Sequence, residues 1–335
     1  MNMRVIQICI GIACTLFFLA LALYRVQLGD VGTALAHADP RWIGAAVAAY
    51  AVNLSLRTWR WQIILRPVAE IPYRVVGKAL LVGYGLNSIM PARLGELFRA
   101  EFFKRSFGLS RIWGLTSIVI ERLFDGLTVV ACLGVGLFLT TTTRLGADIV
   151  IDVLVTGGVL FGTILLAALS LSGSLMSRML SRFPRLSARM GMVQSGFGIL
   201  RTWRTLEVAI LTLIIYLPDA LSLWFLVKAV GRALGFADLL ILVGLASFST
   251  LVPSGPAFLG TLQFAYALAI QFADGPRAVG IAAATLAQLC LLLPVALIAT
   301  GLLTHGSGKP LLSLLKGRSL HAQAPGPHAG DTTGA

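Results

Sequence analysis

From Val5 to Thr304 the chain alternates between long apolar runs and short basic loops. Six of these runs come close to or exceed the roughly 20 residues that an α-helix needs to cross the hydrocarbon core of a bilayer. No stretch between them is long enough for a separate soluble domain, so we expect a single all-α transmembrane domain over residues 1–304. The predicted spans are residues 5–24, 42–64, 112–140, 149–171, 206–230 and 278–303.

Two further apolar stretches, residues 76–106 and 238–273, are interrupted by proline and glycine. The interruptions lie at residues 91–95 and 253–260, where proline removes a backbone donor and glycine permits a tight turn. Each half is too short or too polar to cross a bilayer comfortably. We therefore predict two re-entrant helical hairpins, with two kinked spans of no transport role as the alternative.

The two interrupted stretches also resemble each other in sequence. Both open with Leu-Val-Gly, at Leu81 and Leu242, reach a proline after a short apolar arm, and restart at Leu-Gly. Three predicted spans separate them, so they would enter the membrane from opposite faces. Inverted repeats with broken helices are a known transporter architecture, and the pattern predicts an inverted repeat here.

Composition supports an integral membrane protein. Hydrophobic residues make up 57% of the chain and charged residues 12%, against about 25% charged in an average soluble domain. The net charge is +13, and the arginines and lysines lie in loops between apolar runs, as the positive-inside rule predicts. We therefore expect no nucleic-acid partner. The four cysteines lie singly in apolar segments, and we predict neither a disulfide framework, nor a metal site, nor a cofactor.

The basic loops predict the orientation of the chain. They concentrate on the side of both termini, which we therefore expect to be cytoplasmic, and the first apolar run is expected to stay as a span rather than be cleaved. The cytoplasmic tail, residues 305–335, should be disordered from about residue 320. The longest loop carries six arginines between Arg178 and Arg204 and is either an anchor on anionic lipid or a docking surface for a soluble biosynthetic partner.

Charged and polar residues gather in the first interrupted stretch and in the span that follows it. Ionisable groups at bilayer depth cost roughly 2.5 to 3.5 kcal/mol each, so several together indicate a packed, partly wet site rather than a surface facing lipid. We take these residues as the candidate site for binding and moving a lipid headgroup: Asn87, Arg93, Glu96, Arg99, Glu121, Arg122 and Asp125.

Helical spacing brings these groups together. Glu121 and Asp125 lie one turn apart and need a cationic partner in a low dielectric, for which Arg93 or Arg99 is the nearest candidate. One interpretation is an ion-paired clamp that holds the first hairpin against the next span. The other is a cavity in which arginines bind phosphate while carboxylates balance charge, receive an ammonium group or carry a proton. The two interpretations are compatible.

Other polar residues inside apolar runs are secondary candidates. Asp219, beside Pro218, either lines the same cavity or pairs with a neighbour. Snorkelling toward the cytoplasmic surface explains Arg60 well and Arg57 less well. The second interruption contributes Pro253, Ser254, Gly255 and Gln263.

Catalytic motifs are missing from the sequence. It contains no G-x-x-x-x-G-K-[ST] loop, no H-E-x-x-H and no G-x-S-x-G elbow, and its four histidines fall in predicted loops or the tail. We therefore predict no catalytic residues and a protein that is not an enzyme. The alternative is an intramembrane transferase that uses Glu121 or Asp125 as a general base.

The motif N-x-x-x-P-x-R-x-G-E-x-x-R from Asn87, followed by E-R-x-x-D from Glu121, resembles the flippase-like membrane family. That family comprises the transmembrane domain of lysylphosphatidylglycerol synthases and its stand-alone relatives. The resemblance covers roughly residues 5 to 304 and implies a bacterial inner-membrane protein that translocates lipid. The aminoacyl-transferase domain is absent from this chain, so we expect no lipid lysylation. Relatives tend to carry glutamate where this chain has Gln263, and glutamine cannot carry a coupling proton.

These observations predict a flippase or scramblase that moves a phospholipid, glycolipid or polyprenyl or hopanoid-type lipid between leaflets. The expected partners are membrane lipids with anionic or zwitterionic headgroups, and the oligomeric state stays open. Two alternatives from other classes are an intramembrane lipid-modifying enzyme and a membrane scaffold that recruits a lipid-biosynthetic enzyme.

Overall fold

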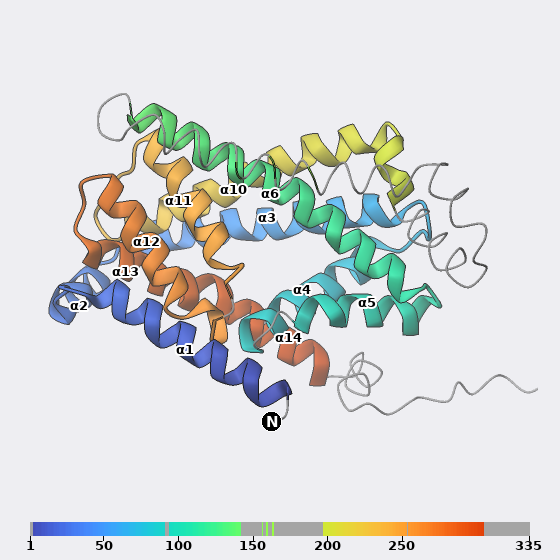
Figure 1. The fold of residues 1–335 in the computed structure, drawn as a ribbon, viewed down its shortest axis with the longest axis horizontal. Coiled ribbons are helices and arrows are strands. Elements are labelled where there is room, and N and C mark those ends of the chain that lie inside the picture. Colours follow the sequence, from blue (N-terminus) through green and yellow to red (C-terminus); the bar gives the residue numbers. More distant parts are fainter. Residues whose placement is uncertain are drawn as a thin grey trace, which may run out of the picture.

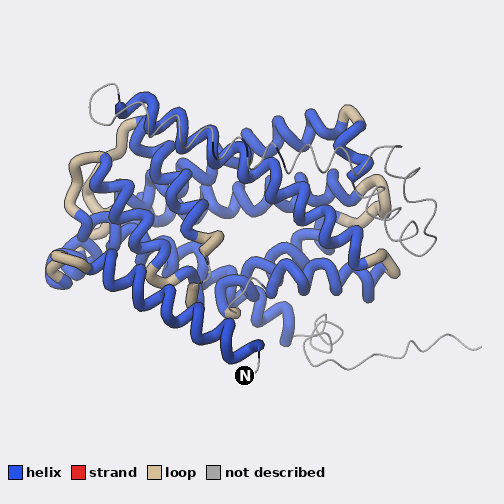
Figure 2. Tube along the Cα trace, in the orientation of Figure 1, coloured by secondary structure: helices blue, strands red, loops and turns tan. Residues whose placement is uncertain are grey.

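The computed structural model describes residues 3–90, 94–141, 197–252 and 254–304, with three single positions at 156, 159 and 163. In these residues all regular secondary structure is helical, which confirms the all-α prediction (Figure 2). Several predicted features lie outside the described residues: most of the span at 149–171, most of the arginine-rich loop, the tail at 305–335, Arg93 and Pro253.

Three helical segments are long and apolar enough to cross a membrane, and the chain is a multi-pass membrane protein. The first two are α6 (Arg111–Thr141) and α10 (Arg204–Ala229). The third runs from Arg277 to Thr304 and joins α13 (Arg277–Ala287), the π-helical turn η4 (Gln288–Leu292) and α14 (Leu293–Thr304). These segments coincide with the predicted spans at 112–140, 206–230 and 278–303.

The first two predicted spans look different in the structure. α1 (Met3–Leu23) is followed by α2 (Leu28–Ala36), which turns away by 85°, and Gly11–Leu23 together with Leu28–Ala36 has the length and hydropathy of one span. α3 (Pro40–Leu65) has 26 residues but carries Asn53, Arg57 and Arg60, and it is not among the segments apolar enough to count. The described residues therefore hold three candidate spans, or four if α1 and α2 form one.

Both interrupted stretches form paired helices. The first hairpin is α4 (Tyr73–Ile89) packed on α5 (Leu94–Phe107), and the second is α11 (Phe236–Ser249) packed on α12 (Thr261–Phe272), with the short 3-10 turn η3 (Pro256–Phe258) between them. The helices thus break where proline and glycine predict. Gly95 is required at the first crossing, because a Cβ there would collide with the backbone oxygen of Gly83. Gly260 has φ +86°, a conformation that favours glycine.

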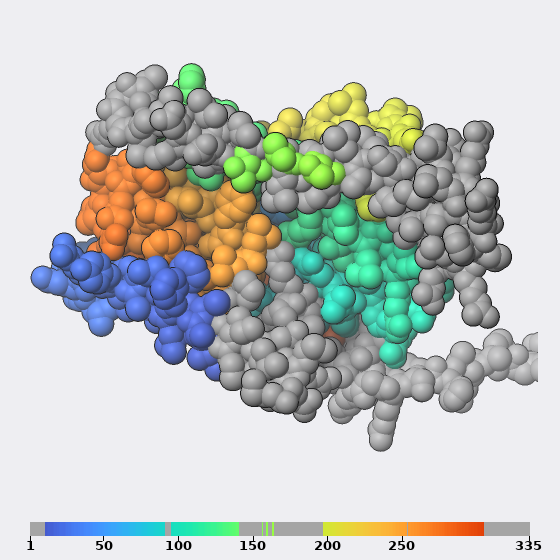
Figure 3. All heavy atoms as spheres, in the orientation of Figure 1, coloured from blue at the N-terminus to red at the C-terminus, as the bar shows by residue number. Residues whose placement is uncertain are grey.

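The long helices and the hairpins of the two halves of the chain pack against one another (Figure 1). α3 lies along α10, α6 packs on α11, and α14 packs on α4. Each hairpin therefore contacts a long helix from the other half of the chain. Within each half, α5 packs on α6 and α12 packs on α13. α1 lies against the second hairpin, as the space-filling view shows (Figure 3).

Candidate functional site

Polar side chains form a stripe on each of three long helices, and the stripes face one another. Residues three, four or seven apart in an α-helix share one face, so each stripe is set by sequence spacing. The three stripes meet where α3, α6 and α10 contact each other. They consist of Asn53, Arg57 and Arg60 on α3, Ser117, Glu121 and Asp125 on α6, and Thr212, Tyr216 and Asp219 on α10.

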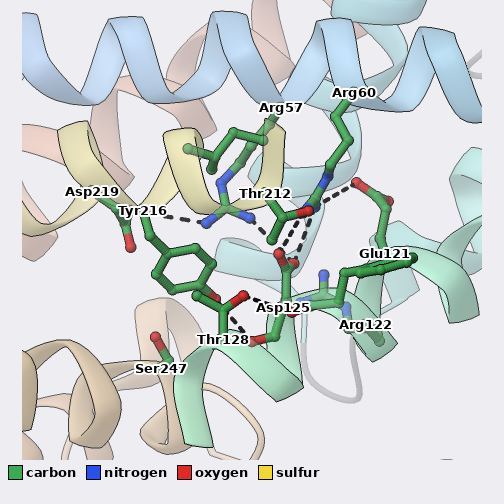
Figure 4. Close-up of polar contacts among 12 residues, drawn as sticks. Arg57, Arg60, Glu121, Arg122, Asp125, Thr128, Thr212, Tyr216, Asp219 and Ser247 are labelled. Atoms are coloured by element: carbon green, nitrogen blue, oxygen red, sulfur yellow. Dashed lines mark hydrogen bonds and ion pairs between the residues drawn. The ribbon is translucent and has the colours of Figure 1, made fainter. Parts of the chain in front are cut away.

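Arg60 is the centre of the ion-pair network, and its side chain is fully buried (Figure 4). Its Nη1 lies 2.6 Å from Oδ1 of Asp125, and its Nη2 lies 3.3 Å from Oε1 of Glu121. Nη1 also donates to Oγ1 of Thr212 at 3.0 Å. Snorkelling was the wrong explanation for Arg60, because two carboxylates on α6 hold its guanidinium inside the helix bundle.

Arg99 binds the other side of Glu121. Its Nη2 donates to Oε2 of Glu121 at 2.6 Å, and both side chains are only 1% exposed. The guanidinium carbon of Arg99 lies 3.6 Å from the ring centroid of Trp61, a cation–π geometry that partly replaces lost hydration. The predicted pairing of Glu121 with Arg99 is confirmed, whereas Asp125 pairs with Arg60. We call Arg60, Arg99, Glu121 and Asp125 the buried clamp.

A cavity of about 280 Å³ lies beside the buried clamp. Its lining contains both polar and apolar side chains, and Asp125 is the member of the clamp that reaches it. The charged or amide side chains in the lining are Asn53, Arg57, Asn87, Arg122, Asp125 and Asp219, and the apolar ones include Val129, Leu223, Phe248, Leu251, Phe258, Leu262, Leu291, Leu292 and Val295.

Arg57 lies between the two aspartates of the lining (Figure 4). Its Nη1 is 3.4 Å from Oδ2 of Asp125, and its Nη2 is 4.0 Å from Oδ1 of Asp219. Its Nε donates to Oδ1 of Asn53 at 2.8 Å, which fixes the side chain along α3. Asp219 therefore lines the same cavity as Asp125 but is held far less tightly.

The first hairpin contributes Asn87 and approaches Arg122 through Glu96. Asn87 lines the cavity, and its Oδ1 accepts a hydrogen bond from the backbone N–H of Gly95 at 2.9 Å, which ties α4 to the start of α5. Arg122 also lines the cavity, and its Nη2 lies 3.2 Å from Oε1 of Glu96. Of the seven predicted residues, the structure places five in the buried clamp or the cavity lining and Glu96 in an ion pair with a lining residue, and Arg93 lies outside the described residues.

The described secondary candidates at the second break, Ser254, Gly255 and Gln263, form hydrogen bonds within the hairpin or to neighbouring helices and do not line the cavity. The backbone N–H of Gly255 donates to Oγ1 of Thr15 on α1 at 2.6 Å. Gln263 accepts from the backbone N–H of Gly260 at 2.8 Å and donates to Oε1 of Gln288 at 2.6 Å. Ser254 is buried and accepts from Thr261.

Sequence reasoning missed the tyrosines of the site. Four of the six tyrosines in the chain line the cavity: Tyr50, Tyr84, Tyr216 and Tyr266. Tyrosine in membrane proteins ordinarily collects at the membrane–water interface, where its ring is apolar and its hydroxyl is wet. Their position deep inside apolar runs is therefore the signal that would have found them.

Comparison with known proteins adds two findings. The family model for the lysylphosphatidylglycerol synthase TM region matches residues 8–299 of the chain. Glycosyltransferase AglD of Haloferax volcanii is 33% identical over 158 residues, which cover 46% of this chain and 25% of that protein. The chain thus matches about a quarter of the length of this curated relative, and the glycosyltransferase name describes that protein.

Proposed function

Because the chain belongs to the lysylphosphatidylglycerol synthase transmembrane family, with a match that spans residues 8–299, we propose that it is a lipid transporter of the flippase or scramblase type. It moves a phospholipid, glycolipid or polyprenyl or hopanoid-type lipid from one leaflet to the other without changing the covalent structure of the lipid. The driving force is an ion gradient or the gradient of the lipid itself.

The cavity carries this proposal. A lipid crossing the membrane must shelter a polar headgroup while its tail stays in an apolar environment. The lining takes charged side chains from α3 and α6, among them Arg57, Arg122 and Asp125, and apolar side chains from α11 and the turn after it, Phe248 and Leu251. Such a division suits an amphipathic cargo, because each part of the cargo meets surface of its own kind.

The clamp supports the cavity mechanically. Glu121, shared between Arg60 and Arg99, fixes α3, α5 and α6 to one another. In this arrangement Arg122 and Arg57 contact the headgroup and Asn87 orients it, while the fully buried pairs hold the helices that carry them. Rigid surrounding helices keep a binding site in place during repeated cycles of loading.

The architecture of the proposal is a pair of re-entrant hairpins related as an inverted repeat, together with six spans and cytoplasmic termini in a bacterial inner membrane. The reciprocal packing supports the repeat, because α6 contacts α11 as α14 contacts α4, and α3 contacts α10 along its length. The basic loops on the side of the termini support the orientation.

Reconstitution into liposomes tests the function. Purified protein is placed in vesicles with a fluorescent lipid in both leaflets, and a membrane-impermeant quencher reports how fast inner-leaflet lipid becomes accessible. We expect the protein to raise this rate, Arg122→Gln to lower it, and Arg105→Gln, which changes a partly exposed arginine paired with Glu101, to leave it unchanged.

Three outcomes would contradict the proposal. Lipid recovered with altered covalent structure would favour an intramembrane enzyme. Activity that requires an added soluble protein would favour a scaffold. Vesicles in which correctly folded protein moves no lipid would exclude transport of the lipids used.

A further inference from the structure

We infer that the cavity binds an uncharged headgroup with several hydroxyl groups, as in the sugar of a glycolipid, in preference to a net anionic headgroup. This inference rests on the proposed function, which it narrows to one class of lipid. It depends on the charge balance of the site, on the free acceptor of Asp219 and on the four tyrosines.

The charges of the site balance within the described residues. Arg60 and Arg99 pair with Glu121 and Asp125 in the buried clamp, and Arg122 pairs with Glu96. Arg57 lies between Asp125 and Asp219. Four arginines thus face four carboxylates, so an added phosphate would bring a charge that these residues do not neutralise. An unneutralised charge in a low dielectric is costly to desolvate.

A cationic headgroup meets a different obstacle. Asp219 and the tyrosine rings would attract an ammonium group, but Arg57 already occupies that position. Its guanidinium carbon lies 5.9 Å from the ring centroid of Tyr216, and its Nη2 lies 4.0 Å from Asp219. A second cation there would repel the first.

Asp219 is suited to accept hydrogen bonds from a sugar. It lines the cavity, its side chain is 19% exposed, and in the described part of the chain its carboxylate makes no hydrogen bond. Its one ion-pair contact, to Arg57 at 4.0 Å, is too long for a hydrogen bond. A carboxylate accepts through both oxygens, and two neighbouring hydroxyl groups of a sugar can donate to it together.

The tyrosines provide the rest of a sugar site. Tyr50, Tyr84, Tyr216 and Tyr266 each combine an apolar ring with a hydroxyl that both donates and accepts. The hydroxyl of Tyr266 is buried and has no hydrogen-bond partner among the described residues. A buried donor without a partner is rare and favours a ligand that supplies one.

The test measures binding and transport separately. Protein in a detergent without sugar is mixed with equal amounts of a glycosyldiacylglycerol, phosphatidylcholine and phosphatidylglycerol, and native mass spectrometry counts each bound lipid. The liposome assay is then run with a labelled form of each lipid. We expect the glycolipid to be bound most often and moved fastest.

Two variants link the preference to the cavity. Asp219→Asn should lower glycolipid movement by about tenfold, as the loss of a charge-assisted hydrogen bond predicts, and Tyr266→Phe by about threefold. Tyr24→Phe, a matched change on a side chain 59% exposed and outside the cavity lining, should have no effect.

The possible results separate this inference from the proposed function. Preferred binding of the glycolipid without movement of any lipid would support the sugar site and contradict transport. Movement of phosphatidylglycerol or phosphatidylcholine at a rate equal to or above that of the glycolipid would support transport and overturn the sugar site. Equal loss of all three lipids in Asp219→Asn would also overturn it, because the residue would then have no role in headgroup choice.

Discussion

The two hairpins occupy corresponding places in the packing but are anchored by different chemistry. α5 is fixed to α6 by the ion pair of Arg99 with Glu121, and Glu121 in turn binds Arg60 on α3. α12 is fixed to η4, the π turn after α13, by a hydrogen bond between two uncharged amides, Gln263 and Gln288. The first anchor joins three helices through charge, whereas the second joins neighbouring segments of the same half.

The two anchors should differ in how much stability the folded state loses when one partner is removed. Removal of one partner from a buried ion pair leaves an uncompensated charge and costs about 3 to 5 kcal/mol. An unsatisfied buried amide costs about 1 to 3 kcal/mol. Substitution of one residue in the anchor of the first hairpin should therefore destabilise the fold strongly. The same kind of change in the anchor of the second hairpin should destabilise it less. Three variants test this comparison, and a fourth extends it to a tightly and a loosely bound carboxylate of the cavity; they follow from the largest expected effect to the smallest.

Arg60→Met removes the shared cation of the buried clamp. Glu121 keeps Arg99, but Asp125 keeps only Arg57 at 3.4 Å, so the folded state should lose about 3 to 5 kcal/mol. Loss of the monodisperse peak in fluorescence-detected size exclusion, or a large fall in Tm in detergent, checks this. Arg105→Met is the control, and equal stability of the two variants would refute the role of Arg60.

Glu121→Gln should destabilise the first hairpin by about 3 kcal/mol, because it leaves Arg99 buried without an acid. The double variant Glu121→Gln with Arg99→Gln should recover part of this loss, since coupled neighbours are not additive. Chemical denaturation of all four members of the cycle gives the coupling energy. Glu101→Gln, a matched change at a more exposed ion pair, should cost less than about 1 kcal/mol. Additive single effects would show that the pair does not act as an anchor.

Gln288→Leu tests the second anchor. The variant leaves Nε2 of Gln263 without its acceptor and the backbone oxygen of Ala257 without its donor, so we expect a loss of about 1 to 3 kcal/mol. The exposed Gln271→Leu serves as the control. A loss equal to or larger than that of Arg60→Met would remove the distinction between a charged and a neutral anchor.

Asp219→Asn should have the smallest effect on stability, below about 1 kcal/mol, because its ion-pair contact among the described residues, to Arg57, is at 4.0 Å. Asp125→Asn makes the same chemical change at a carboxylate bound by Arg60 at 2.6 Å and should cost several times more. Thermal unfolding of both variants in one detergent compares them. Equal Tm values would mean that Asp125 and Asp219 contribute alike to the fold.

Much of this arrangement follows from local sequence signals. Long apolar runs predict α6, α10 and the segment from α13 to α14, and proline with glycine predicts the two helix breaks. The i, i+4 spacing of Glu121 and Asp125 predicts that both face one side, and the need for a cation predicts Arg99 as a partner. Each of these inferences depends either on residues that are close in sequence or on the composition of a single apolar run.

The contribution of Arg60 was not predicted, because it depends on a contact across 65 residues of sequence. An arginine near the end of a span is compatible with snorkelling, and only the packing of α3 on α6 and α10 shows that it turns inward. The stripe of Asn53, Arg57 and Arg60 on one face was the available signal. The tyrosines were missed for a similar reason, since four separate helices bring them to one cavity.

The bond from the Gly255 backbone to Thr15 joins groups 240 residues apart and fastens α1 to the second hairpin. Gly260 lies so close to the Thr15 backbone that an added Cβ would have to displace it. In the proposed transport cycle, a movement of this hairpin would therefore either carry α1 with it or break that hydrogen bond. A spin label near the start of α1 would then report the position of the second hairpin without a probe in the cavity.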